Sequence, residues 1–398
     1  MMDVVERLGY GVELRVEGKA KFYAPRLPSE KGYAPTSLPV FYNPISKPNR
    51  DMAILFTKTF FKGKRIRICE PLAGTGVRSI RLVLETDVVD EVVANDISKK
   101  AYELMKLNIE LNDVGEYVRP MNLEANELLS MCGRGRPRYS YVDIDPAGSP
   151  AKFMENGFRG CDRGGVLSAT ATDMSALTGA KPASCLRKYD VIVSKTPFSK
   201  EVALRILAGF MVRTAARLGL AAKPILSFQK DHYIKVFAVV ERGITKAKEL
   251  LKQVGWISYC HRCMRIYAAG RDERPVMRCV ECGGELNPIG PLWIGRLSDN
   301  DLVEKMYRSA LEDQEIYRDV LKLLRYLSAE DTEIIGYYPV NYVAEVLKQS
   351  PVKPRKVIER LKATGYRATA THIDPSGFKT DASPSVIAKL FRELKLKN

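Results

Sequence analysis

The sequence predicts an α/β fold whose central, mostly parallel sheet has seven strands, the last of them antiparallel. From residue 64 onward, apolar runs typical of strands alternate with segments of helical spacing, an order that produces a parallel sheet with helices on both faces. The last two strand patterns, 224–230 and 233–241, lie so close together that only a hairpin joins them, so one strand is reversed. The chain has 398 residues, too many for one ordinary core, so further domains are expected.

The predicted elements follow in order. Before residue 60 the sequence predicts short strands and turns, including an alternating hairpin over 12–25. Helical spacing predicts helices over 77–85, 98–112 and 200–220. Apolar runs predict strands over 64–72, 91–97, 117–124, 138–145, 164–173, 224–230 and 233–241. A mostly parallel sheet with a reversed final strand is the Rossmann-like arrangement of class I methyltransferases.

The chain is predicted to have three parts. Residues 1–256 hold the methyltransferase-like domain with the hairpin as an N-terminal extension, and residues 257–290 form a Cys-rich insert. Residues 291–398 form a smaller, basic α+β domain, mainly helices with a short strand near 366–373. No run of eighteen apolar residues and no apolar leader occurs, so we expect a cytoplasmic protein without a membrane segment. We expect no obligate protein partner.

The charge of the chain indicates a polyanionic partner. There are 63 Lys and Arg against 47 Asp and Glu, a net charge of +16. The excess is uneven, because residues 349–398 hold 11 basic and 4 acidic residues, which makes a net +7. That segment is a candidate for contact with phosphates. The alternative is a soluble protein that is merely basic.

The segment EPLAGTG, residues 70–76, joins the first predicted strand of the sheet to its helix. It supplies Glu70, and its residues Gly74 and Gly76 let the backbone approach a ligand closely. The dinucleotide fingerprint GxGxxG is not met, since Ser79 stands at the third glycine position, and the phosphate-binding loop GxxxxGK[ST] is absent. Alone, the segment indicates either a ligand site or a tight turn.

Two further acids at strand ends favour the ligand site. Asp96 ends the second strand of the sheet, where it can accept hydrogen bonds from both hydroxyls of a ribose, and Glu124 ends the third, where it can accept from an adenine amine. Arg78, one turn into the following helix, can pair with a carboxylate. An adenosine that carries an amino-acid tail describes S-adenosylmethionine, so the sequence predicts this donor.

The fourth strand ends in DIDPAGSP, residues 143–150. Asp143 and Asp145 lie two residues apart, so in a strand they face the same side. We expect Asp145 to accept a proton from a substrate amine, and Pro146 to fix the backbone so that a carbonyl accepts the second hydrogen. A simple Asp-Pro turn is the alternative.

The chain resembles the tRNA (guanine-26-N2)-dimethyltransferase family of archaea and eukaryotes over most of its length. The motifs that carry the resemblance are FYNPISKPNRD (41–51), GTGVRSIR (74–81), NDIS (95–98), NLEAN (122–126), DIDPAGSP (143–150), TATDMSALTGAKPASCLRKY (170–189), KDHYIKVF (230–237) and GFKTDAS (377–383). One departure is Ala147, where the family usually has a bulky residue after Asp-Pro.

The resemblance implies methyl transfer from S-adenosylmethionine to N2 of a guanosine at position 26 of tRNA, with Asp145 as the acid-base residue. It implies that the donor contacts are Arg50, Arg78, Asp96, Glu124 and Ala125. Phe41 is implied to lie near the donor or the target base. Whether one or two methyl groups are added stays open, as do an amine of another RNA or DNA base as target and an inert, zinc-containing RNA-binding protein.

Two other predictions concern metal and RNA. Cys260, Cys263, Cys279 and Cys282 form a C-x2-C, 15 residues, C-x2-C pattern, which is typical of a zinc ribbon with a structural zinc ion. Free reduced thiols are the alternative. Lys379, in the motif GFKTDAS, is predicted to contact tRNA, although a solvated lysine in a turn explains it nearly as well.

Overall fold

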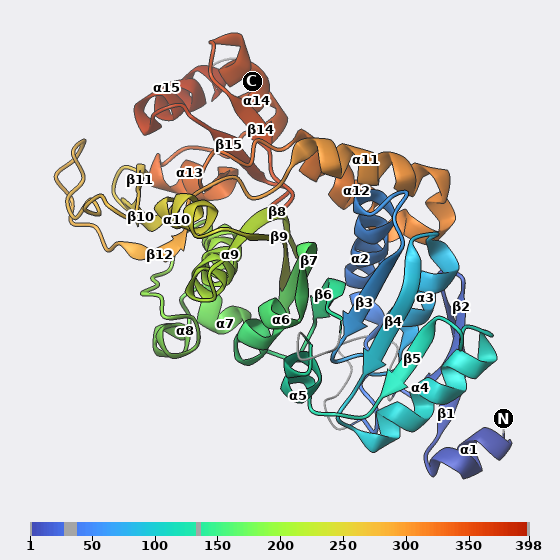
Figure 1. Ribbon diagram of the computed structural model, residues 1–398. Helices are drawn as coiled ribbons and strands as arrows, with labels where there is room; N and C mark the ends of the chain where they lie inside the picture. The colour runs from blue at the N-terminus through green and yellow to red at the C-terminus, as the bar shows by residue number, and fades with distance from the viewer. Residues whose placement is uncertain (1, 28–37, 133–136, 396–398) are drawn as a thin grey trace. The chain divides into compact units, whose positions relative to one another are not determined.

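The computed structural model describes residues 2–27, 38–132 and 137–395 (Figure 1). The chain folds into two compact units. The first contains the described residues of Met1–Pro146, Lys152–Ala169 and Glu304–Leu324, and the second those of Ala147–Ala151, Thr170–Val303 and Arg325–Asn398. The first unit thus includes helical residues from the region where the sequence predicts a separate C-terminal domain.

A seven-stranded sheet has the strand order β5-β4-β3-β6-β7-β9-β8. Its strands are β3 (Ile66–Glu70), β4 (Val89–Asn95), β5 (Val118–Met121), β6 (Tyr139–Ile144), β7 (Cys161–Ala171), β8 (Leu220–Lys230) and β9 (Tyr233–Arg242). The pairs β3–β4, β4–β5, β3–β6 and β6–β7 are parallel, and β8–β9 is an antiparallel hairpin. β9, the last strand in sequence, lies between β7 and β8.

The other elements of the first unit begin with an antiparallel hairpin. This hairpin joins β1 (Val12–Glu17) to β2 (Ala20–Pro25) and confirms the predicted one. The helices are α1 (Met2–Leu8), α2 (Lys47–Phe60), α3 (Val77–Glu85), α4 (Lys99–Leu111), α5 (Ala125–Ser130) and α6 (Met154–Gly160), with short 3-10 turns at Pro44–Ser46 and Ala151–Phe153. α11 (Asn300–Glu312) and α12 (Gln314–Ala329) follow the insert and lie partly in this unit.

The prediction of short strands and turns before residue 60 is wrong for two helices, α1 and α2, and α2 shows the reason. Residues 48–57 of this helix are all buried, polar ones included. Arg50 and Asp51 are among them, and their charges are paired within the protein. Because polar residues lie on the buried faces, the apolar period that announces an amphipathic helix is missing.

The second unit contains two small sheets besides its part of the large one. The strands β10 (Val254–Tyr259), β11 (Ile266–Ala269) and β12 (Ile289–Trp293) form one, in the order β11-β10-β12. The strands β13 (Tyr338–Pro339), β14 (Ala368–Ala370) and β15 (Gly377–Thr380) form the other, in the order β13-β15-β14. The helices are α7 (Met174–Leu177), α8 (Pro182–Tyr189), α9 (Ser199–Arg217), α10 (Ile244–Lys252), α13 (Val340–Val346), α14 (Pro354–Ala363) and α15 (Pro384–Lys395). No helix in the described part of the chain has the length and apolar character needed to cross a membrane.

A buried ion network ties the N-terminal hairpin to the helices α2 and α3 of the same unit. The guanidinium of Arg81, on α3, has no exposed surface and contacts Glu17 at 2.8 Å, Asp51 at 2.7 Å and Glu85 at 2.7 Å. Glu17, on β1, also accepts a hydrogen bond from Arg50 Nε at 2.7 Å. Burial alone raises the pKa of Glu17, but Arg50 and Arg81 lower it to about 2. The hairpin is therefore held by charge as well as by apolar packing.

We predict that Glu17→Gln destabilises the fold in a pH-dependent way. The pKa of Glu17 is depressed from 4.5 to about 2, so its contribution is complete above pH 4.5 and is lost as the pH falls toward 2. The variant should lose about 3–5 kcal/mol of unfolding free energy at pH 7, because two buried guanidinium groups lose a partner. At pH 3 the difference from the wild type should be smaller by roughly 2 kcal/mol. Urea unfolding followed by circular dichroism measures both values.

Glu13→Gln is the matched control, since Glu13 lies on the same strand and pairs with Arg15 while 37% exposed. This variant should differ little from the wild type at either pH. An unchanged difference between the Glu17→Gln variant and the wild type from pH 7 to pH 3 would contradict the assignment.

Candidate active site

The loop between β3 and α3 needs glycine at two positions. Gly74 and Gly76 have φ of +57° and +75°, a left-handed backbone that other residues rarely adopt. A Cβ on Gly74 would lie 2.9 Å from the carbonyl oxygen of Phe41, and a Cβ on Gly76 would lie 2.6 Å from Met105 Cγ. The loop therefore packs closely against the backbone of Phe41, a residue that is 47% exposed. The predicted donor loop and the FYNP motif lie together.

Asp96 follows the end of β4 and orients this loop. Its carboxylate accepts hydrogen bonds from Gly74 N at 3.0 Å and from Ser98 N at 2.9 Å. Burial raises the pKa of Asp96, although these two amides lower it. The carboxylate is thus fixed at the carboxyl edge of the sheet, where the sequence predicts a ribose.

Asn95, which the sequence analysis missed, joins three strand ends. Its side chain has no exposed surface, and its Nδ2 donates to Pro71 O and Leu123 O, both at 3.0 Å. Its Oδ1 accepts from Leu123 N at 2.9 Å. One amide therefore sets the spacing of the loops after β3, β4 and β5. The only sequence signal is an Asn directly before the predicted Asp96.

Glu124 and Ala125 lie at the start of α5. Glu124 does not end a strand, because β5 stops at Met121. Its side chain caps α5 by accepting from Asn126 N at 2.7 Å and Glu127 N at 3.1 Å. Ala125, the first residue of the helix, is buried. The structure thus places both residues at a helix start next to the strand ends, with one Glu124 oxygen in the cap.

Arg78, in the first turn of α3, contacts three carboxylates. Its Nε lies 3.3 Å from Glu70, and its two terminal nitrogens contact Asp143 and Asp145. Burial alone lowers the pKa of Arg78, but the acids raise it well above its usual value, so the guanidinium stays charged. The carboxyl groups of β3 and β6 are drawn together by this cation.

The three acids differ in their surroundings. Glu70 is buried, and burial raises its pKa to about 7, although Arg78 and the hydroxyl of Ser79 lower it. The side chain of Asp143 is fully buried, whereas that of Asp145 is 21% exposed. Of these two aspartates, only Asp145 therefore has a side chain with exposed surface. Pro146 follows it and is buried.

A chain of hydrogen bonds supports this pair from the core. The hydroxyl of Ser168, on β7, donates to Asp143 Oδ1 at 2.6 Å. The hydroxyl of Tyr141, on β6, lies 3.0 Å from Ser168 Oγ. Tyr141, Ser168 and Asp143 were not among the predicted site residues. Tyr141 and Ser168 give no signal in the sequence, because each is an ordinary strand residue.

Arg50 is buried next to the same region. It donates to Glu17 and to the carbonyl oxygen of Asn43, and its guanidinium lies 5.3 Å from the centre of the Tyr42 ring. The polar groups that hold Arg50 come from β1 and from the FYNP motif. Its side chain thus lies beside the segment that packs against Gly74, although its printed partners are all protein groups.

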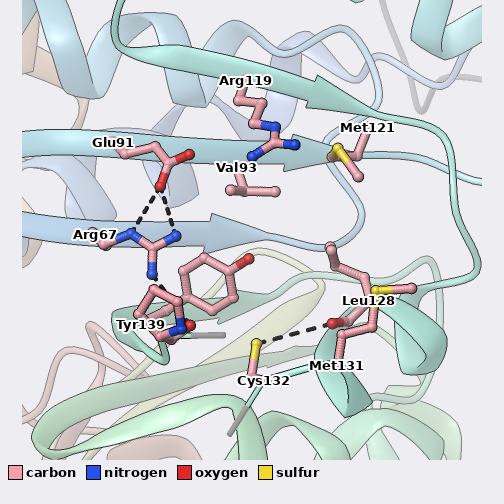
Figure 2. A pocket seen from close by; sticks show the side chains of 10 residues that line it. Arg67, Glu91, Val93, Arg119, Met121, Leu128, Met131, Cys132 and Tyr139 are labelled. Atoms are coloured by element: carbon pink, nitrogen blue, oxygen red, sulfur yellow. Dashed lines mark hydrogen bonds and ion pairs between the residues drawn. The ribbon is translucent and has the colours of Figure 1, made fainter. Parts of the chain in front are cut away.

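A separate cavity of about 450 Å³ lies in the first unit, and Figure 2 shows the side chains that line it. Its charged side is formed by Arg67, Glu91 and Arg119 of β3, β4 and β5, and its apolar side includes Leu128 of α5 and Tyr139. Arg67 Nε donates to Glu91 at 2.8 Å. Its lining includes none of Glu70, Asp96 and Asp145, the described acids at the carboxyl ends of the strands.

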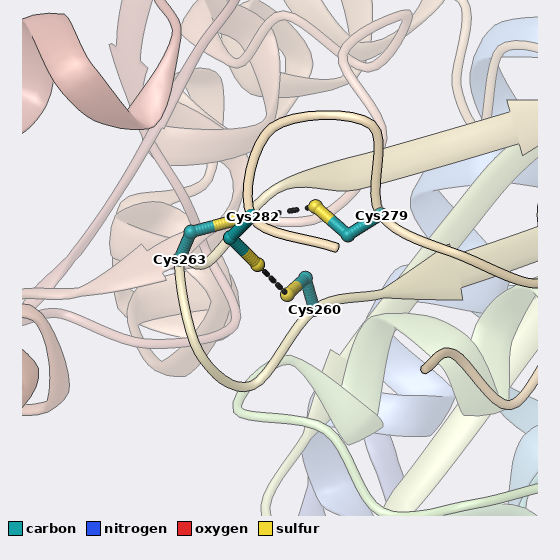
Figure 3. Close-up of side chains that lie close together, drawn as sticks. All are labelled: Cys260, Cys263, Cys279 and Cys282. Atoms are coloured by element: carbon teal, nitrogen blue, oxygen red, sulfur yellow. Dashed lines mark hydrogen bonds between the residues drawn. The ribbon is translucent and has the colours of Figure 1, made fainter. Parts of the chain in front are cut away.

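The four clustered cysteines of the second unit come together (Figure 3). Their sulfur atoms all lie within 4.8 Å of one another, with 3.4 Å between Cys260 and Cys282 and between Cys263 and Cys279. The two motifs form similar turns, because Met264 N donates to Cys260 O and Gly283 N donates to Cys279 O. Four thiolates around a tetrahedral zinc ion lie about 3.8 Å apart, given Zn–S bonds of about 2.3 Å. The cluster has the donor set and size for a metal ion.

Lys379 is not placed for the predicted contact with tRNA. Its side chain, on β15, has no exposed surface. The ammonium donates to Ile334 O at 2.9 Å and pairs with Glu201 at 2.9 Å and Glu330 at 3.5 Å. A buried ammonium with these partners offers nothing to a phosphate, so this prediction is wrong for the described structure.

Comparison with known proteins identifies the family. Residues 18–392 match the family of N2,N2-dimethylguanosine tRNA methyltransferases. The tRNA (guanine(26)-N(2))-dimethyltransferase of Pyrobaculum aerophilum is 38% identical over 381 residues, 95% of this chain and 96% of that protein. The tRNA (guanine(26)-N(2)/guanine(27)-N(2))-dimethyltransferase of Aquifex aeolicus is 35% identical over 388 residues, 96% of each.

The chain belongs to this family. It is therefore a tRNA (guanine-N2)-methyltransferase, as the resemblance implied. The structure of Trm1 from Pyrococcus horikoshii in complex with S-adenosyl-L-methionine matches with a TM-score of 0.83 and 32% identity, covering 95% of this chain and 99% of that one. The predicted class I methyltransferase fold is confirmed.

We predict that Gly74→Ala impairs donor binding beyond its effect on stability. The new methyl group would press on the Phe41 carbonyl and move the segment that packs on the loop. Gly63→Ala is the matched control, since Gly63 has φ of +76° and open space around it. Both variants should lose about 1–2 kcal/mol of stability. Only Gly74→Ala should raise the Kd for S-adenosylmethionine, by about tenfold or more, in isothermal titration calorimetry. Equal Kd values for the two variants would contradict the close packing.

Proposed function

We propose that this chain transfers two methyl groups from S-adenosylmethionine to N2 of guanosine 26 in tRNA, with Asp145 as the proton acceptor. The observation that carries the proposal is the position of Asp145 directly after β6. There it is the partly exposed member of a carboxylate pair gathered by Arg78. Methylation at guanine 27 as well is the second candidate, because the similar Aquifex aeolicus protein is named for both positions.

The donor is proposed to lie along the carboxyl ends of β3, β4 and β5. Gly74 and Gly76 give it a bare backbone, and Asp96 is fixed for the ribose by two amides. Glu70, Glu124 and Ala125 are proposed to border it at the ends of the loops. Arg50 and Arg78 are proposed to attract its carboxylate. The donor supplies a methyl group on a sulfonium, and a neutral thioether is the leaving group.

Asp145 is proposed to accept the proton that the N2 amine of guanine loses. The N2 amine of guanine is a weak nucleophile, because its lone pair is delocalised into the ring. Transfer forms an N–C bond and breaks the S–C bond, and the amine must then lose one proton. A carboxylate within hydrogen-bond reach accepts that proton and orients the lone pair. Since the side chain of Asp145 is 21% exposed, the proton can then leave to water before a second transfer.

The rest of the base site is proposed around Phe41 and Pro146. Phe41 is 47% exposed and its carbonyl oxygen packs against the Gly74 loop, so we propose that its ring contacts a base that leaves the tRNA stack. Pro146 is proposed to fix a backbone carbonyl for the second amine hydrogen. Ala147 is exposed and has no bulky side chain. We propose that another side chain forms the wall of the base site that a bulky residue would form here in relatives.

The division of labour along the chain is part of the same proposal. Residues 1–256 are proposed to carry the chemistry, and residues 291–398 to contact tRNA through their basic surface. Residues 257–290 are proposed to hold a structural zinc ion through Cys260, Cys263, Cys279 and Cys282. Four thiolates leave no open position on the metal, so zinc would stabilise the ribbon and take no part in methyl transfer.

Asp145→Asn should lower kcat by about 10²–10⁴, because the amide cannot accept the proton. Methyl incorporation into a tRNA transcript measures the rate, and nucleoside digestion with mass spectrometry identifies N2-methylated guanosine. The Kd for S-adenosylmethionine, measured in the same preparation, should stay within a few-fold of the wild-type value.

A transcript with adenosine in place of guanosine 26 is the substrate control. Loss of all methylation on that transcript supports position 26, and residual methylation would point to position 27. A kcat for Asp145→Asn equal to that of the wild type, with the donor still bound, would contradict the assignment of Asp145 as the proton acceptor.

Metal analysis should find one zinc ion per chain. Cys260→Ser combined with Cys282→Ser should abolish it and lower the thermal stability of the ribbon, because two of four ligands are lost. Cys185→Ser is the control, since Cys185 is a buried, lone cysteine outside the cluster, and this variant should keep its zinc. A wild-type protein that is purified without any metal, and in which the thiols of Cys260, Cys263, Cys279 and Cys282 are free to titrate, would contradict the zinc site.

A further inference from the structure

The C-terminal part of the second unit has the topology of a winged helix-turn-helix module. A short strand, β13, is followed by the helices α13 and α14, and then by the antiparallel strands β14 and β15 (Figure 1). β15 returns to pair with β13, so the sheet order is β13-β15-β14. Two consecutive helices backed by such a sheet form a common nucleic-acid-binding unit, in which the second helix faces the ligand.

The second helix, α14, is built as a surface helix with one apolar side. Pro354 occupies its first turn, where a missing N–H costs nothing. Val357 and Leu361, one turn apart, are buried, and α14 packs against β14 and β15. The opposite side is open to solvent.

That open side is strongly basic. The segment from residue 353 to 363 holds five cations, Lys353, Arg355, Lys356, Arg360 and Lys362, and one acid, Glu359. All six residues are exposed, and the net charge is +5 − 1 = +4. We call these residues the α14 basic face.

Its ion pairs are too exposed to cancel this charge. Arg355 pairs with Glu359 while the two side chains are 89% and 59% exposed. Arg360 pairs with Glu393 of α15 while they are 46% and 40% exposed. Exposed pairs contribute about 0–1 kcal/mol, so a phosphate can replace either carboxylate at little cost.

The segment between β14 and β15 is, in contrast, anchored in the protein. His372 N donates to Glu330 at 2.9 Å, and His372 Nε2 accepts from Gln229 N at 3.1 Å. Thr371 Oγ1 donates to Glu330 at 2.9 Å. Glu330 in turn pairs with the buried Lys379. The connection that forms the wing in such modules is thus tied inward, and α14 is the element left to meet a ligand.

We propose that the α14 basic face binds the phosphate backbone of a double-helical arm of the tRNA. This inference rests on the proposed function for the identity of the RNA. Helical RNA is recognised mainly through its phosphates and shape, because its deep major groove is closed to side chains. A face with five cations and a single exposed acid, Glu359, suits that mode. The contact holds the tRNA without reading its sequence.

The test removes three cations from the face, in the variant Lys353→Ala/Arg355→Ala/Lys362→Ala. The control removes three lysines from the exposed side of α10, in Lys246→Ala/Lys248→Ala/Lys252→Ala, and changes the net charge equally. The Kd for a tRNA transcript is measured at several salt concentrations, together with kcat and KM for methylation. Binding of S-adenosylmethionine and thermal unfolding report that each variant is folded.

The α14 variant should weaken tRNA binding by about tenfold or more and reduce the slope of log K against log salt by roughly 2–3. KM for tRNA should rise while kcat at saturating tRNA stays within about twofold. The α10 control should match the wild type. A Kd and salt slope of the α14 variant equal to those of the control would overturn the proposal. The proposal would also be overturned if the α14 variant lost binding to poly-L-glutamate as strongly as binding to tRNA. That result would indicate a binding site for acidic proteins.

The proposed function and the RNA contact of α14 can fail separately. If the wild type binds tRNA but incorporates no methyl group, while the α14 variant still loses salt-dependent binding, the proposed function fails and the RNA contact stands. If the wild type methylates guanosine and the α14 variant binds tRNA normally, the RNA contact fails alone.

Discussion

One buried guanidinium determines how the carboxyl edge of the sheet is arranged. Glu70, Asp143 and Asp145 would repel one another in a region largely removed from water, and Arg78 is the cation between them. Burying charges is favourable only when the pairing geometry is good, so the cluster requires α3 to begin immediately after Gly76. That start places the first turn of the helix between the ends of β3 and β6. The position of the proposed catalytic carboxylate thus follows from charge balance.

The same helix repeats this solution one turn later. Arg81 is fully buried and meets Glu17, Asp51 and Glu85, while Arg78 meets the acids of the strand ends. α3 therefore carries two cations that serve two separate acid clusters. One cluster ties down the N-terminal hairpin, and the other assembles the site. Glu17 also holds Arg50, so the hairpin and the FYNP motif support the same side chain.

Sequence patterns predicted the features that depend on local rules. The alternation of strands and helices, the glycines of the loop, the acids after β4 and β6 and the cysteine spacing each follow from near neighbours. Features that depend on distant partners were missed. Asn95 and Ser168 form hydrogen bonds with groups that only the parallel sheet brings together. The helix α2 lacks an apolar helical period, because its charged residues are buried in ion pairs. Lys379 lies in the motif GFKTDAS, but the sequence does not show that its ammonium is buried and pairs with Glu201 and Glu330. Glu124 was placed one element early, because a helix cap and a strand end look alike in sequence.

The hydrogen bonds of Asn95 carry a lesson for protein engineering. The hydrogen bonds of one side-chain amide fix the distances between the loops after β3, β4 and β5. The length of each loop is therefore coupled to the lengths of the other two. An insertion in any one of them breaks a bond of a group that has no access to solvent. Attempts to graft a loop from another enzyme, in order to accept an altered donor, will therefore succeed only when all three loops are exchanged as a set.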